Sequence, residues 1–89
     1  MAVQERQDLI DHWIESNPSL SGPHEARLVG YGVPVWALIA HLRVVEDPRR
    51  VATDYGLLMD AIEAVLAYYR QHRALIDARI ALNEAAFEG

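Results

Sequence analysis

The sequence predicts a mainly α-helical single domain, and three observations support this. The chain has 89 residues and a mass of 10.0 kDa, which leaves room for one hydrophobic core. From residue 58 to residue 87 it contains neither Gly nor Pro and is rich in alanine. Further segments place apolar residues at helical spacing. We expect a three-helix, homeodomain-like helix-turn-helix unit with a short β arm, an N-terminal amphipathic helix and a long C-terminal helix.

Composition excludes several classes of protein. The chain is 52% hydrophobic and 24% charged, which is too apolar for a disordered chain and too mixed for a fibrous one. It has no cysteine, so disulfides and thiol nucleophiles are excluded. No apolar run approaches the roughly 20 residues of a membrane span, and the polar N-terminus does not fit a signal peptide. We therefore expect a cytoplasmic protein that has no contact with membranes.

The first half of the chain is expected to contain two helices and an extended arm. Residues 3–15 form an amphipathic pattern that Pro18 must end, and residues 18–23 have the composition of a loop. Residues 26–35 are a β-prone stretch with two glycines, which predicts a short strand or arm. A core helix should then run over residues 35–43. The apolar positions that define the two helices are Leu9, Ile10, Trp13 and Ile14, and Val35, Trp36, Leu38, Ile39 and Leu42.

Residues 48–65 fit a helix-turn-helix. Asp47 is a good N-cap, and Pro48 suits the first helical position because its missing N–H would have no partner there. The short helix should stop at Gly56, and the small side chain of Ala52 lets two helices approach each other. The expected shared core consists of Val51, Tyr55, Leu57, Ile62 and Val65.

The sequence offers few side chains that are suited to binding DNA. Eight basic against thirteen acidic residues give a net charge of −5, whereas binding to phosphates favours a basic protein. The second helix would present Leu58, Met59, Asp60 and Glu63 to the bases, which is a poor set for the major groove. The arginines available for phosphates are Arg27, Arg43, Arg49 and Arg50. They can equally be solvated arginines beside acidic neighbours.

The long C-terminal helix is expected to extend beyond the domain. A helix of about 30 residues is ~45 Å long, whereas a compact domain of this size has a diameter of about 30 Å. Its apolar seam consists of Ile62, Leu66, Tyr69, Ile76, Ile80 and Phe87. An exposed seam would be an association surface. Alternatively, the N-terminal helix folds back over the seam, or the long helix frays after Arg79.

Three stretches carry a resemblance to a known family: RLVGYGVPVWAL at residues 27–38, TDYGL at residues 53–57 and AVLAYY at residues 64–69. Together they resemble the domain-of-unknown-function family four hundred and thirty-three, whose members look like VapB-type antitoxins. The likeness covers residues 26–70. In this sequence Tyr31-Gly32 replaces the family's Thr-Arg, and Gly56 replaces its turn proline. These differences are compatible with the implied fold, but they remove a positive charge near the arm.

The resemblance implies an antitoxin that binds a PIN-like ribonuclease toxin and blocks it by direct contact, and that also represses its own operon. It divides the chain into an N-terminal helix and linker (1–25), a helix-turn-helix core (26–70) and a toxin-binding extension (71–89). An arginine inserted among the metal-binding carboxylates of such a nuclease would obstruct them. The residues that would contact the toxin are Tyr69, Arg70, Arg73, Ile76, Arg79, Ile80 and Phe87.

The sequence offers little for catalysis. The four histidines, His12, His24, His41 and His72, show no spacing typical of a metal site, and no Gly-x-Ser-x-Gly motif is present. We therefore expect no enzymatic activity, no metal and no cofactor. Two other hypotheses remain beside the antitoxin: a dimeric helix-turn-helix transcriptional repressor that binds DNA, and a homodimeric helical scaffold whose C-terminal tails pair.

Overall fold

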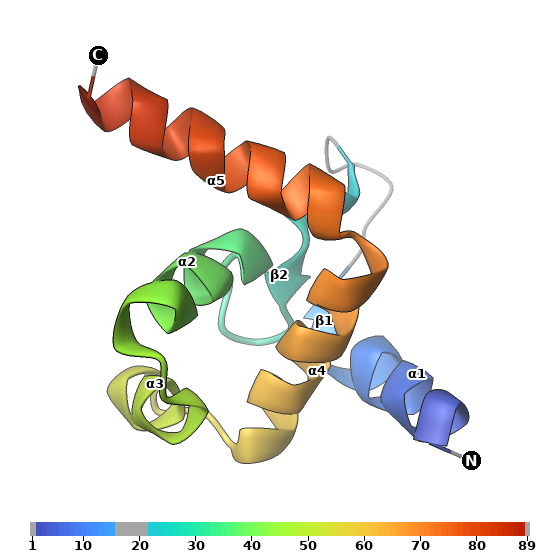
Figure 1. Cartoon of the computed structure of the whole chain (residues 1–89). Coiled ribbons are helices and arrows are strands. Elements are labelled where there is room, and N and C mark those ends of the chain that lie inside the picture. The colour runs from blue at the N-terminus through green and yellow to red at the C-terminus, as the bar shows by residue number, and fades with distance from the viewer. Residues whose placement is uncertain (1, 16–21, 89) are drawn as a thin grey trace.

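The computed structural model describes residues 2–15 and 22–88, with side chains for residues 7–15 and 22–86. This part of the chain is mainly helical, with a two-stranded antiparallel sheet. The elements are α1 (Ala2–Trp13), β1 (Ile14–Glu15), the 3-10 helix η1 (Pro23–Glu25), β2 (Arg27–Leu28), α2 (Val35–Val45), α3 (Pro48–Tyr55), α4 (Met59–Gln71) and α5 (Arg73–Glu88) (Figure 1). The loop predicted over residues 18–23 falls mostly on residues 16–21, which lie outside the described residues.

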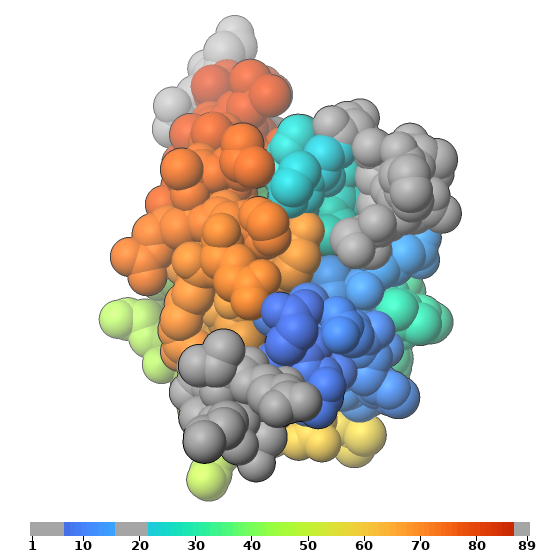
Figure 2. Space-filling view, turned by 90° about the vertical axis from the view of Figure 1, so that its right-hand side faces the viewer, coloured from blue at the N-terminus to red at the C-terminus, as the bar shows by residue number. Residues whose placement is uncertain are grey.

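Helix α4 runs through the centre of the molecule, and the other helices pack around it. Helix α1 lies along one side of α4, α2 and α3 lie on another, and α5 lies across α2 and η1. Figure 2 shows α1 beside α4, and η1 beside α5, on one face. The core side chains larger than alanine are Ile10, Ile14, Leu28, Val35, Leu38, Ile39, Val51, Leu57, Ile62, Val65, Tyr68, Ile76 and Ile80. Among the described helices, none is long and apolar enough to cross a membrane.

The predicted arm contains β2, one strand of the two-stranded antiparallel sheet. The N-terminal helix ends at Trp13, two residues earlier than expected, because Ile14 pairs in an antiparallel register with Leu28. Both side chains are buried, so this strand pair forms part of the core that packs against α4. After β2 the chain turns through Gly30 (φ 82°) and Gly32 (φ 70°), a backbone region that favours glycine.

Helix α3 has the bounds that its sequence predicts. Asp47 Oδ1 accepts a hydrogen bond from the Arg49 backbone N–H at 3.1 Å, which caps the first turn. Gly56 ends the helix in the left-handed conformation (φ 67°). The Leu57 N–H then donates to the Ala52 carbonyl at 2.8 Å, and both side chains are buried between α3 and α4.

The prediction of one long C-terminal helix is wrong. Helix α4 ends at Gln71 and α5 begins at Arg73, with His72 (φ −131°, ψ 32°) between them. The chain turns there, so that Ile76 and Ile80 become buried against the body of the protein. Ile76 and Ile80 of the expected seam are therefore core residues, and α5 contacts α2 and η1 there, whereas α1 contacts α4, which carries the first part of the seam. Tertiary packing overrides the local preference for a continuous helix.

Candidate partner-binding surface

A stripe of exposed alanine and leucine side chains runs along α5, and the exposed charges of this helix, Arg73 and Glu84, lie beside it. We define this outer face of α5 as Ala74, Leu75, Ala78, Ala81, Leu82 and Ala85, all of which are exposed. Leu75 and Leu82 are 47% and 67% exposed. The positions recur every three or four residues, so the six side chains form one stripe along the helix.

The charged residues of α5 lie off this stripe. Asp77 and Arg79 flank the buried side, where Ile76 and Ile80 are 0% and 1% exposed. An exposed helix face normally has charged or polar residues. A continuous apolar stripe in solvent is typical of a surface that packs against another helix.

The predicted toxin-binding residues do not form one surface. Ile76 and Ile80 are core residues, so their assignment to an exposed contact surface is wrong. Arg79 is occupied within the chain: its Nε donates to Glu25 Oε1 at 2.8 Å, and its guanidinium carbon lies 4.2 Å from the centre of the Trp36 ring. Both contacts fix α5 to η1 and α2. The side chain of Phe87 lies outside the described residues.

Tyr69 lies in a polar cluster where α2, α4 and α5 meet. Its hydroxyl donates to Asp77 Oδ1 at 2.6 Å, and Arg43 contacts both Tyr69 and Asp77. The hydrogen bond with Tyr69 and the charge of Asp77 raise the pKa of Arg43 above its ordinary value. Both members of the ion pair are partly exposed, so it contributes at most about 1 kcal/mol. Its main effect is to orient α5.

Two of the predicted arginines are exposed on either side of the junction between α4 and α5. Arg73 lies with its guanidinium carbon 5.4 Å from the Tyr69 ring centre, and Arg70 is exposed on the last turn of α4. Neither forms an ion pair with a carboxylate among the described side chains. Arg70 and Arg73 are therefore the predicted toxin-contacting arginines that stay available to a partner.

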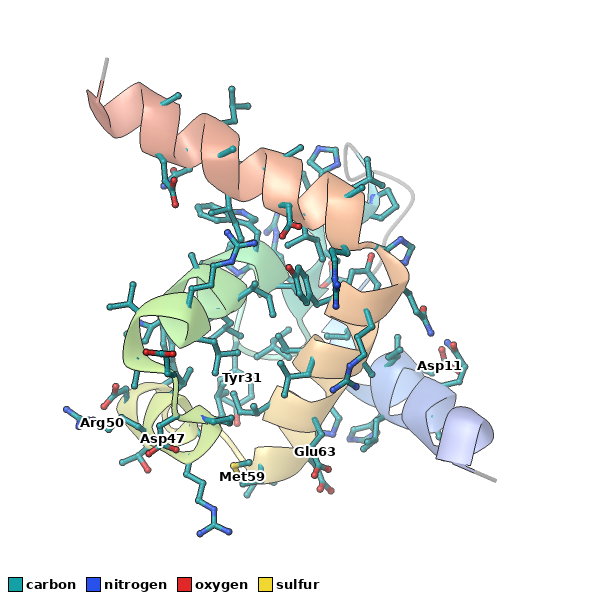
Figure 3. The ribbon with its side chains drawn as sticks, viewed as in Figure 1. Asp11, Tyr31, Asp47, Arg50, Met59 and Glu63 are labelled. Carbon is teal, nitrogen blue, oxygen red and sulfur yellow. The ribbon has the colours of Figure 1, made fainter. Side chains whose placement is uncertain are left out.

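The four arginines considered for DNA do not form one surface. Arg43 is held against α5, and Arg27 lies on β2. Arg49 and Arg50 are exposed on α3, where Arg50 Nε lies 3.3 Å from Asp54. Figure 3 shows Asp47 at the start of α3 and Arg50 on that helix, and Met59 and Glu63 in the first two turns of α4.

The histidines lie in four separate places. His12 contacts Trp13, His24 lies beside Glu25, and His72 packs on Tyr68 with ring centres 4.5 Å apart. His41 lies 3.4 Å from the Tyr55 hydroxyl and 3.6 Å from Asp54, where it links α2 to α3. Within the described residues, no three His, Cys, Asp or Glu side chains are placed to hold a metal ion.

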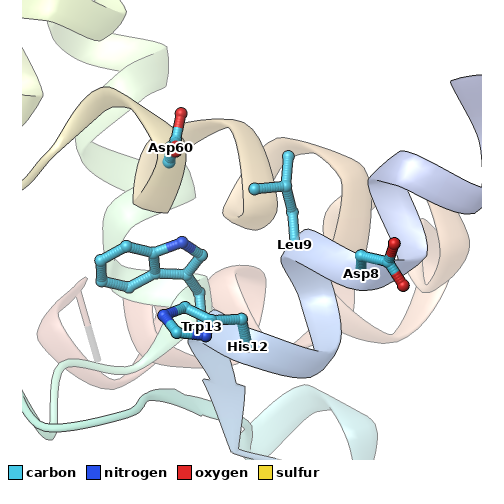
Figure 4. A pocket seen from close by; sticks show the side chains of 5 residues that line it. All are labelled: Asp8, Leu9, His12, Trp13 and Asp60. Atoms are coloured by element: carbon cyan, nitrogen blue, oxygen red, sulfur yellow. The ribbon is translucent and has the colours of Figure 1, made fainter.

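A shallow, open pocket of about 470 Å³ lies between α1 and the first turn of α4 (Figure 4). Trp13 and Leu9 provide its apolar wall, and the carboxylate of Asp60 lies on the opposite side. His12 and Asp8 complete the lining. An aromatic face opposite a carboxylate suits a cationic side chain, but the lining contains no nucleophile beside a base.

Sequence analysis did not identify the outer face of α5. The apolar residues at positions 75, 78, 82 and 85 repeat with spacings of three and four, which is the signal that would have revealed it. The competing seam through Ile76 and Ile80 has the same periodicity and larger side chains. Because helix spacing identifies both seams equally well, only the fold shows which one is buried.

No protein-family model, curated protein or solved structure matches this chain.

Proposed function

We propose that this protein is an antitoxin that binds and neutralises a PIN-like ribonuclease through the outer face of α5. The observation that supports this proposal is the exposed stripe that includes Leu75 and Leu82, which has no charged residue along three turns of helix. A helix with such a face can pack into an apolar groove of a partner. The resemblance of residues 26–70 to VapB-type antitoxins gives the class of partner.

Arg70 and Arg73 supply the inhibitory chemistry in this proposal. Both are exposed, Arg70 on the last turn of α4 and Arg73 on the first turn of α5, and guanidinium groups pair well with carboxylates. Paired with the metal-binding acids of the nuclease, they would block the position of the metal and of the RNA phosphate. Arg79 has no such role, because Glu25 and Trp36 already hold it.

The finer fold assignment belongs to the same proposal. Helices α2, α3 and α4 would serve as a helix-turn-helix scaffold, with the turn at Gly56. The buried Ala52 allows α3 and α4 to approach each other. This scaffold presents α5 and does not need to bind DNA, because the first turn of α4 is acidic and apolar.

The test is to co-express the full chain with the nuclease encoded by the neighbouring reading frame. The double variant Leu75→Glu/Leu82→Glu removes two exposed leucines from the interface without changing the core. Together these side chains contribute about 2–4 kcal/mol when buried, so Kd should rise by about 30- to 700-fold. Co-purification should be lost and ribonuclease activity should return.

The matched control is Val44→Glu on α2. Val44 is 82% exposed, so the variant adds the same charge to an exposed apolar position on another surface. It should bind the nuclease like the parent chain. Circular dichroism should show equal helix content in both variants. If the double variant still inhibits the nuclease, or if the neighbouring frame encodes no PIN-like nuclease, the proposal is wrong.

A further inference from the structure

The junction of α4 and α5 breaks a helix where the sequence contains no helix breaker. The His72 N–H closes α4 on the Tyr68 and Tyr69 carbonyls, and α5 starts from the His72 carbonyl. The backbone N–H groups of residues 73–75 therefore have no helical acceptor on residues 69–71. In a continuous helix all three would be bonded.

Contacts between α5 and the rest of the protein maintain the bend. Ile76 and Ile80 are buried against the body, Asp77 binds Arg43 and Tyr69, and Arg79 binds Glu25. Local sequence favours the straight form, whereas these contacts favour the bent one. Local and tertiary preferences therefore disagree at this junction, which is unfavourable within one chain.

A second copy of the chain can satisfy both preferences. Its α5 supplies the same side chains, so the contacts that α5 makes with α2 and η1 can form between two copies instead of within one. His72 is then free to become helical, and the three unbonded N–H groups gain acceptors. Exchange of an identical element in this way is a known route to dimers.

We propose that this chain forms an exchanged dimer. Helices α4 and α5 join as one continuous helix, and α5 of each copy packs on α2 and η1 of the other. The proposal does not depend on the proposed function, because it rests on the junction at His72 and on the contacts of the buried side of α5. Within one copy the tether at His72 favours self-docking at low concentration, so the exchanged form should increase with protein concentration.

The test uses two charge-reversed full-length chains. Arg43→Asp places two acids in contact with each other, and Asp77→Arg places two arginines in contact. When the two chains form an exchanged heterodimer, position 43 on α2 of each chain contacts position 77 on α5 of the other. The two positions then carry opposite charges, so both ion pairs are restored. The double variant in one chain restores the pair internally and is the folding control.

The two chains, one with a mass tag, are partly unfolded together at high concentration, refolded and measured by native mass spectrometry. Heterodimer should exceed each homodimer by about tenfold or more. A mixture without such an excess overturns the proposal. The outcome remains informative if either chain alone folds poorly, because mixing should then restore helix content.

Proline at position 74 provides a second test. The first turn of a helix tolerates proline, so Ala74→Pro should keep α5 in the bent form, whereas in a continuous helix its ring would collide with the Arg70 carbonyl. Introduced into both charge-reversed chains, it should abolish the heterodimer. Ala74→Gln is the matched control at the same exposed site and should preserve it. Persistence of the heterodimer with proline contradicts the proposal.

Discussion

Replacing Ile80 with alanine should destabilise the protein far more than replacing Leu82. The two residues lie on the same helix and are similar in size, but Ile80 is 1% exposed and Leu82 is 67% exposed. Truncation of a buried isoleucine costs about 2–5 kcal/mol, because burial is lost and a cavity remains. Truncation of an exposed leucine changes stability by about 0.5 kcal/mol or less.

The loss of stability expected for Ile80→Ala is large compared with the total stability of a small domain. Folded proteins are typically stable by about 5–15 kcal/mol, and for 60–100 residues each kcal/mol corresponds to about 4–8 °C in Tm. Ile80→Ala should therefore lower Tm by roughly 8–40 °C. Leu82→Ala should leave Tm within a few degrees of the parent protein.

Urea and thermal unfolding followed by circular dichroism at 222 nm measure both variants. Near-ultraviolet signals from the aromatic side chains should follow the same transition, as two-state unfolding requires. Equal losses of stability for the two variants would refute the docking of α5, because an undocked helix would expose both side chains alike.

Three more predictions concern the body of the protein. The Tyr68 hydroxyl donates to the Pro23 carbonyl at 2.9 Å, and burial raises the pKa of Tyr68 above its ordinary value of 10.0. The folded state thus retains this proton longer than the unfolded chain, so stability should fall as pH rises above about 10. A pH series of Tm should show less alkaline loss in Tyr68→Phe, which costs about 1 kcal/mol at neutral pH. Asp47→Ala removes the α3 cap and should cost about 1 kcal/mol in urea unfolding, while Asp47→Asn should cost much less. Gly56→Ala places a side chain in the left-handed region (φ 67°) and should cost about 1 kcal/mol. A stable Gly56→Ala variant would show that the turn relaxes.

Sequence predicted the helices that have local signals. The N-cap at Asp47, the proline after it and the glycine at position 56 determine α3 from side chains that are adjacent in the chain. The start of α2 at Val35 follows from apolar spacing and a preceding proline in the same way. Interactions over a few residues decide these boundaries, so neighbouring residues are sufficient to predict them.

Sequence did not predict the features that depend on distant residues. The break at His72 has no local cause, since it arises from the packing of Ile76 and Ile80 and from the pairing of Asp77 with Arg43, 34 positions away. The strand at Ile14 likewise depends on Leu28. The candidate surface could not be assigned from sequence for the same reason. Two seams on α5 have equivalent spacing, and contact with α2 determines which of them is buried.

The positions of the tryptophans make the two outlying helices separately observable. The chain has two tryptophans: Trp13 lies on α1, and Trp36 lies on α2 beneath the guanidinium of Arg79 from α5. Trp36 emission should therefore change when α5 leaves the body, and Trp13 emission when α1 does. Single-tryptophan proteins with phenylalanine at the other position would give fluorescence signals that time the release of each end of the chain.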